Sequence, residues 1–149
     1  MNIVAQYVNH PLDTADFEAE AWQRCQPIEI NHYWSGEPAS RERHAEARIC
    51  WSSEALHVRF VGAQTEPVIV SDAPQTDQKT LGLWDRDVCE IFVAPDALNP
   101  ARYYEFEAAP TGEWIDLGIV VKPDGRETDW NFVSGFTTAA KLESDRLLI

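Results

Sequence analysis

The sequence predicts an all-β fold, an antiparallel β-sandwich of the jelly-roll or immunoglobulin-like kind with one short N-terminal helix. Two observations favour this class. Apolar and polar residues alternate with period two over several short runs, and clusters of turn-forming residues separate those runs. The chain has 149 residues, of which 44% are hydrophobic, so it is long enough for one packed core. We therefore expect a single domain over residues 1–149.

The first expected element is a helix over residues 13–25, "DTADFEAEAWQRC". Asp13 or Thr14 can cap its N-terminus, and acidic residues in the first turn complement the helix dipole. Trp22 supplies an apolar contact, and Pro27 ends the helix.

Short strands follow, with turns between them. The run 87–95, "DVCEIFVAP", is apolar on both faces, which predicts a central strand. "APTGE" between two of the runs is a hairpin signal, and 122–130 is expected to be a turn. The expected strands are 28–34, 45–51, 55–62, the start of 65–82, 87–95, 102–110, 113–121 and 132–144, the last as one strand or two.

The last residues, "SDRLLI", resemble a turn followed by the start of a new apolar strand. A chain that ends inside a strand either lacks the C-terminal part of its domain or supplies its own sheet edge, and we expect the C-terminal part to be missing. An incomplete sheet edge of this kind exposes unpaired backbone groups and apolar side chains. The sequence thus predicts a homo-oligomer formed through that edge, or poor solubility.

The charge balance disfavours two classes of partner. The chain has 25 acidic and 12 basic residues and a net charge of -13, which repels phosphate backbones and anionic lipids. We expect no nucleic-acid partner and no membrane partner. The N-terminal residues lack the pattern of a signal peptide, and no apolar run is long enough to span a bilayer, so the expected location is cytoplasmic.

The cysteines predict a reduced protein. Cys25, Cys50 and Cys89 lie far apart and form no C-x-x-C motif. Because Cys50 and Cys89 lie within apolar runs, buried free thiols are expected.

The segment 81–95, "LGLWDRDVCEIFVAP", holds the strongest candidate site. Trp84 offers an aromatic face for the C–H groups of a pyranose, and Asp87 and Glu90 can accept hydrogen bonds from hydroxyls. This combination suits a neutral saccharide. Two alternatives stay open: Trp84 can be a core residue beside a solvated acidic loop, and Glu90 can pair with Arg59 or Arg102.

The neighbouring run, "YYEFEAAPTGEW", offers a second group of polar side chains. Alternation places Tyr103, Glu105 and Glu107 on one face and Tyr104 and Phe106 on the other. The first face either extends a binding surface or is the solvent-exposed face of an antiparallel sheet, and the sequence slightly favours the solvent-exposed face.

An acidic loop is a weaker candidate for a calcium site. Asp72, Asp77 and Asp85 supply the oxygen ligands that calcium prefers, but their spacing differs from the D-x-D-x-D-G loop. A solvated acidic loop is the favoured alternative. The other tryptophans are expected to be core residues or loop anchors: Trp22, Trp34, Trp51 and Trp130.

Several of these motifs occur in a familiar order: "EARICWSSEALHVRFVG", then "LWDRDVCEIFVAP", then "YYEFEAAPTGEWID". The chain resembles the family 9 carbohydrate-binding modules and family 9-like domains, within the wider DOMON-type β-sandwich group. The resemblance runs from the expected helix to "FTTAAKLES". Its most specific part is W-x-x-D-x-x-E-[IV]-F with the tyrosine-rich strand.

The resemblance implies roles for individual residues. Trp84 and Glu90 match the positions that hold a terminal sugar, and Asp87 matches the loop aspartate; Tyr104, Glu105 and Trp114 would flank them. Two family features have no match here: a second tryptophan near the C-terminal end, and an arginine on the strand that here contains "YEF". The family also carries structural calcium, which implies calcium as a possible cofactor, with no other certain one.

The function expected is therefore a non-catalytic module that binds a saccharide, an accessory to carbohydrate catabolism at most. An alternative is a sandwich that has lost sugar binding and serves as a structural or interaction module. A haem-binding DOMON-type domain is less favoured, because His44 and His57 are not placed as a ligand pair. No catalytic motif is present, so no enzyme activity is expected.

Overall fold

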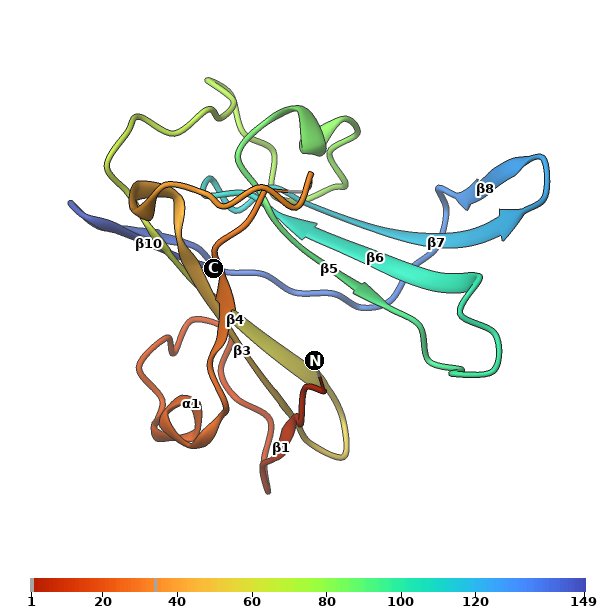
Figure 1. The fold of residues 1–149 in the computed structure, drawn as a ribbon, viewed down its shortest axis with the longest axis horizontal. Helices are drawn as coiled ribbons and strands as arrows, with labels where there is room; N and C mark the ends of the chain where they lie inside the picture. Colours follow the sequence, from red (N-terminus) through yellow and green to blue (C-terminus); the bar gives the residue numbers. More distant parts are fainter. Residues whose placement is uncertain (1, 34) are drawn as a thin grey trace. The chain divides into compact units, whose positions relative to one another are not determined.

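The computed structural model describes residues 2–33 and 35–149, and Figure 1 shows its elements. The predicted all-β, β-sandwich-like class is confirmed, because the described chain forms two mainly antiparallel sheets and a single short α-helix. The sheets belong to two compact units. The first unit comprises Met1–Val68 and Ala139–Ile149, and the second comprises Ile69–Thr138.

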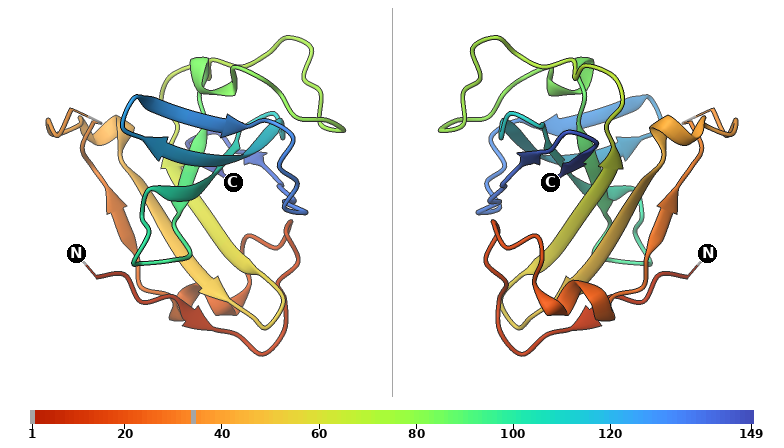
Figure 2. Two further views of the ribbon diagram at one scale, coloured as in Figure 1. Left: turned by 90° about the vertical axis from the view of Figure 1, so that its right-hand side faces the viewer. Right: turned by 90° about the vertical axis from the view of Figure 1, so that its left-hand side faces the viewer.

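The sheet of the first unit is built around a long hairpin, drawn in orange and yellow in Figure 2. All seven residues of β3 pair with β4, as the alternation in "AEARICW" and "ALHVRFVG" predicts. Both β1, which is parallel, and β2, which is antiparallel, pair with the other edge of β3. The strands are β1 (Gln6–Tyr7), β2 (Ile28–Ile30), β3 (Ala45–Trp51), β4 (Leu56–Ala63), β9 (Lys141–Leu142) and β10 (Arg146–Leu148).

The C-terminal residues form a strand that is paired on both sides. β10 is not an open edge: it lies between β4 and β9 and pairs antiparallel with both. Ile149 also exchanges two backbone hydrogen bonds with Phe60, and Leu148 is buried. The apolar run "RLLI" therefore has partners within its own unit, so it does not provide the unpaired edge on which the predicted self-association depended.

The helix is shorter than the sequence predicts. α1 covers Glu20–Arg24, and Ala19 precedes it without a side-chain cap. The expected cap residue Asp13 instead accepts a hydrogen bond from the backbone N–H of Ala15, a local turn that competes with helix formation. Trp22 is buried, as predicted. A 3₁₀ turn, η1, covers Arg41–Arg43.

The sheet of the second unit is a simple antiparallel meander in the order β5-β6-β7-β8. Its strands are β5 (Cys89–Val93), β6 (Arg102–Ala108), β7 (Trp114–Lys122) and β8 (Gly125–Asp129), and a 3₁₀ turn, η2 (Leu83–Asp85), precedes β5. The predicted hairpin between β6 and β7 is confirmed, with Gly112 at a positive φ of 84° that suits glycine. β5 is an edge strand, so the central position that its apolar faces predicted is wrong.

Three loop assignments also differ from the sequence-based expectation. Residues 65–70 form no strand, and 132–140 lie in irregular chain although their pattern predicted a strand. Conversely, much of the expected turn 122–130 is β8, which extends the β7 hairpin. These segments contain few long apolar runs, so alternation alone does not decide whether they pair.

Each unit has its own apolar cluster. In the first, Val8, Ala21, Trp22, Cys25 and Cys50 pack together. In the second, Leu83 and Ala109 pack with three residues of β7, Ile115, Leu117 and Ile119.

All three cysteines are free, as expected. Cys50 is buried as predicted and Cys25 is buried too, whereas Cys89 is only half-buried. None of the helices among the described residues has the length and apolar character needed to cross a membrane.

Candidate functional site

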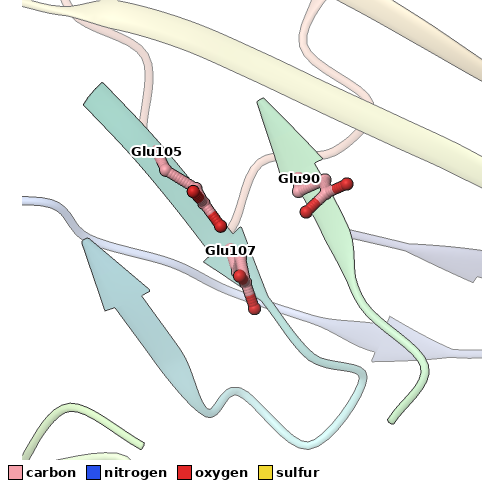
Figure 3. A group of neighbouring side chains, drawn as sticks. All are labelled: Glu90, Glu105 and Glu107. Carbon is pink, nitrogen blue, oxygen red and sulfur yellow. The ribbon is translucent and has the colours of Figure 1, made fainter. Parts of the chain in front are cut away.

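Three glutamates meet on one face of the β5–β6 pair. Glu90 of β5 lies directly opposite Glu107 of β6, and Glu105 lies two positions away on the same face of β6. One carboxylate oxygen from each of the three lies within 4.8 Å of the others. Figure 3 shows the three side chains gathered beside these strands. We call Glu90, Glu105 and Glu107 the glutamate cluster.

The glutamate cluster is largely removed from solvent. Glu107 is 0% exposed and Glu105 is 7% exposed, whereas Glu90 is exposed. The expectation that this face of β6 is its solvent-exposed face is therefore wrong. It is the face that also carries Ile115 and Leu117 on β7, so apolar neighbours surround the carboxylates.

The buried carboxylates of the cluster lack partners. Within the described chain, neither oxygen of Glu107 nor Oε2 of Glu105 has a hydrogen-bond donor. Burial, together with the neighbouring carboxylate of Glu105, raises the pKa of Glu107 to about 8. Burial and the charge of Glu105 also raise the pKa of Glu90. The cluster is thus a site of concentrated, poorly compensated negative charge.

Other buried acids in this unit are compensated. Glu113 lies 3.1 Å from Arg86 Nη1 and accepts a hydrogen bond from the Thr111 hydroxyl. Asp116 Oδ1 lies 2.6 Å from Lys79 Nζ, and Oδ2 accepts hydrogen bonds from the backbone N–H and hydroxyl of Ser134. Pairing of this kind is the usual condition for burying a carboxylate, so the glutamate cluster departs from the pattern of its own sheet.

Trp84 lies in η2 with much of its indole accessible. It is 44% exposed, whereas the preceding Leu83 is fully buried in the apolar cluster of this unit. Its ring centroid lies 6.3 Å from that of Trp130, which is 47% exposed. Leu83, and not Trp84, is therefore the core residue of this turn, and the two indoles form an accessible aromatic pair.

Trp130 is a candidate that the sequence analysis assigned to the core or to a loop anchor. The sequence offers little indication of a binding role for Trp130, because this residue lies immediately after β8 in a segment expected to be a turn. Trp22 is buried as expected, and Trp51 is 46% exposed against Tyr7. Trp34 lies outside the described residues.

Glu90 has no hydrogen bond or ion pair with any described residue, so the predicted alternative of an arginine partner is not what the structure presents. Arg59 instead donates to the Phe17 carbonyl and lies near Glu46 in the first unit. Arg102 pairs in the β6–β7 ladder with Val120 and forms no ion pair among the described residues.

The remaining predicted site residues do not form one surface with Glu90. Tyr104 and Trp114 lie on the opposite face of the sheet, because they alternate with Glu105 and Ile115. Tyr104 stacks on Phe132 at 4.7 Å, and the Trp114 indole donates to the Thr76 carbonyl.

Asp87 has a structural contact. Its Oδ2 accepts a hydrogen bond from the backbone N–H of Ile69, and its own N–H donates to the Ile69 carbonyl. These bonds close the loop that precedes β5, so Asp87 holds the backbone at the start of the strand that carries Glu90.

The expected calcium loop is not assembled. Asp72, Asp77 and Asp85 are exposed and are not among the described acids that gather within 4.8 Å. The acids that do gather are those of the glutamate cluster.

A shallow open pocket of about 370 Å³ lies near the cluster, lined by Phe92, Ala94, Pro100 and Tyr103. Phe92 and Tyr103 make an edge-to-face contact at 5.8 Å and share the face of Glu90 and Glu105. This face of β5 and β6 therefore combines apolar, aromatic and acidic groups.

Comparison with protein families agrees with this fold. Residues 14–145 match the model of the family described as carbohydrate family 9 binding domain-like. Because the match spans most of the chain, the protein belongs to this family of carbohydrate-binding modules. Searches of curated proteins and of solved structures returned no match.

Proposed function

We propose that this chain binds a neutral saccharide through the aromatic pair Trp84–Trp130 and Glu90, without catalysing a reaction on it. The family is one of carbohydrate-binding modules, which supports the general function. The specific proposal rests on the exposed indole of Trp84, which follows the buried Leu83 in the chain. This indole lies near a second exposed indole, that of Trp130.

The chemistry of these groups suits a sugar. A pyranose presents C–H groups that pack on an indole face, and its hydroxyls donate to carboxylates. Glu90 is exposed and has no partner of its own, so it is available as an acceptor. A few such contacts support modest affinity, because binding must offset the lost freedom of the ligand.

The test is calorimetric titration with gluco-, xylo- and galacto-oligosaccharides. We expect at least one of these glycans to bind the wild-type chain, and Trp84→Ala to weaken that binding by about tenfold or more, the loss of about 1.4 kcal/mol. Trp51→Ala is the matched control, because Trp51 is similarly exposed at 46% but belongs to the first unit. Circular dichroism checks that both variants fold.

Two results would count against the proposal. One is the absence of binding to every glycan of the panel. The other is unchanged binding in Trp84→Ala combined with loss in Trp51→Ala, which would place the sugar in the other unit.

A further inference from the structure

We infer that the glutamate cluster is a binding site for one divalent cation. The ligands are the carboxylates of Glu90, Glu105 and Glu107. This inference does not rest on saccharide binding, and it places the ion away from the loop aspartates that the sequence suggested.

The spacing of the oxygens fits one divalent cation. One oxygen from each glutamate lies within 4.8 Å of the other two. Calcium takes oxygen ligands at about 2.3–2.6 Å, so two oxygens on opposite sides of it can be about 4.6–5.2 Å apart. The three oxygens are therefore close enough together to coordinate one ion.

The burial of Glu107 points independently to a ligand. Its side chain is 0% exposed, and neither of its oxygens has a hydrogen-bond donor among the described residues. Its side chain lies beside those of Glu90 and Glu105 (Figure 3). An ionised carboxylate in such surroundings is costly unless a cation compensates it.

The rest of the sheet shows how that compensation is normally provided. Glu113 has Arg86, and Asp116 has Lys79. For the glutamate cluster, no described lysine or arginine forms an ion pair with any member. A bound cation supplies the missing positive charge.

The cluster also has an entry side. Glu90 is exposed and lies on β5, an edge strand of its sheet. An ion can therefore reach the two buried glutamates past Glu90, and water can complete its coordination on that side. Glu90 has two oxygens, so a calcium ion on one leaves the other free for a hydroxyl.

The experiment is titration of the chelator-treated chain with calcium chloride alone, followed by calorimetry and by thermal unfolding. We expect one calcium ion per chain and a rise in the unfolding midpoint, because an ion that binds only the folded state stabilises it.

Variants locate the ion. Glu107→Gln and Glu105→Gln keep the side-chain shape and each remove one charge, and each is expected to weaken calcium binding by about tenfold or more. Above about pH 8, where Glu107 is ionised, Glu107→Gln is also expected to raise the unfolding midpoint in chelator, because it removes an uncompensated buried charge. If Glu107 only stabilised the fold, its replacement by glutamine would lower the unfolding midpoint instead. If one variant fails to fold, Glu90→Gln provides the same test from the exposed side.

Asp72→Asn and Asp77→Asn are matched controls, since they make the same change in charge on the exposed loop of the same unit. Calcium binding should survive in both.

The inference is overturned if wild type binds no calcium at about 5 mM, beyond the weak end of protein calcium sites near 10⁻³ M. It is also overturned if the glutamine variants bind like wild type or if the asparagine controls lose the ion. Because no sugar is present, these outcomes are separate from failure of the saccharide proposal.

Discussion

Buried acids in the second unit fall into two groups at the residue scale. Glu113 and Asp116 are paired with cations, while Glu105 and Glu107 have each other and Glu90 as neighbours. The two groups have opposite effects on stability. A paired carboxylate is stabilising in its charged form, and an unpaired buried one is stabilising only when protonated.

The first prediction concerns pH. Glu107 has a pKa of about 8 in the folded chain, against an ordinary value of 4.5. Between these values the folded state holds a proton that the unfolded chain has lost, so in chelator the free energy of unfolding should fall as pH rises from about 5 to 8 and level off above. Glu107→Gln should flatten this decline. Urea unfolding at a series of pH values measures it, and an equal slope in the variant would refute the assignment.

The second prediction concerns Lys79. Burial acts to raise the pKa of Asp116, but hydrogen bonds from Lys79 and Ser134 outweigh it and hold that pKa below its ordinary value. Lys79→Met leaves the carboxylate without its cation and should cost about 3–5 kcal/mol of unfolding free energy. Lys122→Met is the control: its pair with Glu127 is exposed, so the cost should be below about 1 kcal/mol. Equal losses in denaturant unfolding would contradict the account.

At the scale of elements, η2 presents adjacent side chains to different surroundings. Leu83 is fully buried among residues of β7, whereas Trp84 is accessible. Leu83 therefore anchors the turn in the apolar cluster, while Trp84, the next residue, stays exposed to solvent.

The third prediction follows from that division. Leu83→Ala should lower the free energy of unfolding by about 2–5 kcal/mol, since it opens a cavity in the apolar cluster. Trp84→Ala should lower it by less than about 1 kcal/mol. Guanidinium unfolding of both variants compares them directly. A large loss of stability in Trp84→Ala would indicate that its indole is a packing residue after all.

The sequence predicted some elements well, for physical reasons that the structure makes plain. β3, β4, β6 and β7 alternate apolar and polar residues over much of their length, which is the pattern that identifies a strand from sequence. Alternation assigns Glu90 and Glu107 each to one face of its own strand, but only the pairing of the two strands shows that these residues lie opposite each other. Burial of Glu107 was missed because a glutamate in a strand is normally solvated.

Other features required information that local sequence does not carry. β5 is apolar on both faces yet lies at a sheet edge, because edge or centre depends on which strands pair. Trp130 follows an expected turn, and its approach to Trp84 joins residues far apart in the chain. The exposure of Trp84 was likewise open from sequence, because an indole can serve either as a core residue or as a binding surface.

At the scale of the whole molecule, the C-terminal residues form an inner strand of the first unit's sheet. β10 pairs with β4 and β9, and it buries Leu148 and Ile149.

The fourth prediction is that deletion of Arg146–Ile149 unfolds the first unit. The deletion removes a strand paired on both sides and two buried apolar side chains, which should cost at least about 3 kcal/mol. Far-ultraviolet circular dichroism during thermal unfolding detects the loss, and deletion of residues 1–4, which precede β1, is the control. Wild-type unfolding in the shortened chain would contradict the topology.

The most direct test of saccharide binding uses the indole N–H signals of the chain's six tryptophans in a nitrogen-15 correlation spectrum. Single-tryptophan variants assign the signals, and glycans are then added in turn. We predict that a binding glycan shifts the signals of Trp84 and Trp130 and leaves those of Trp22 and Trp51 in place. Unmoved Trp84 and Trp130 signals with every glycan, or shifts confined to Trp51, would contradict the proposal.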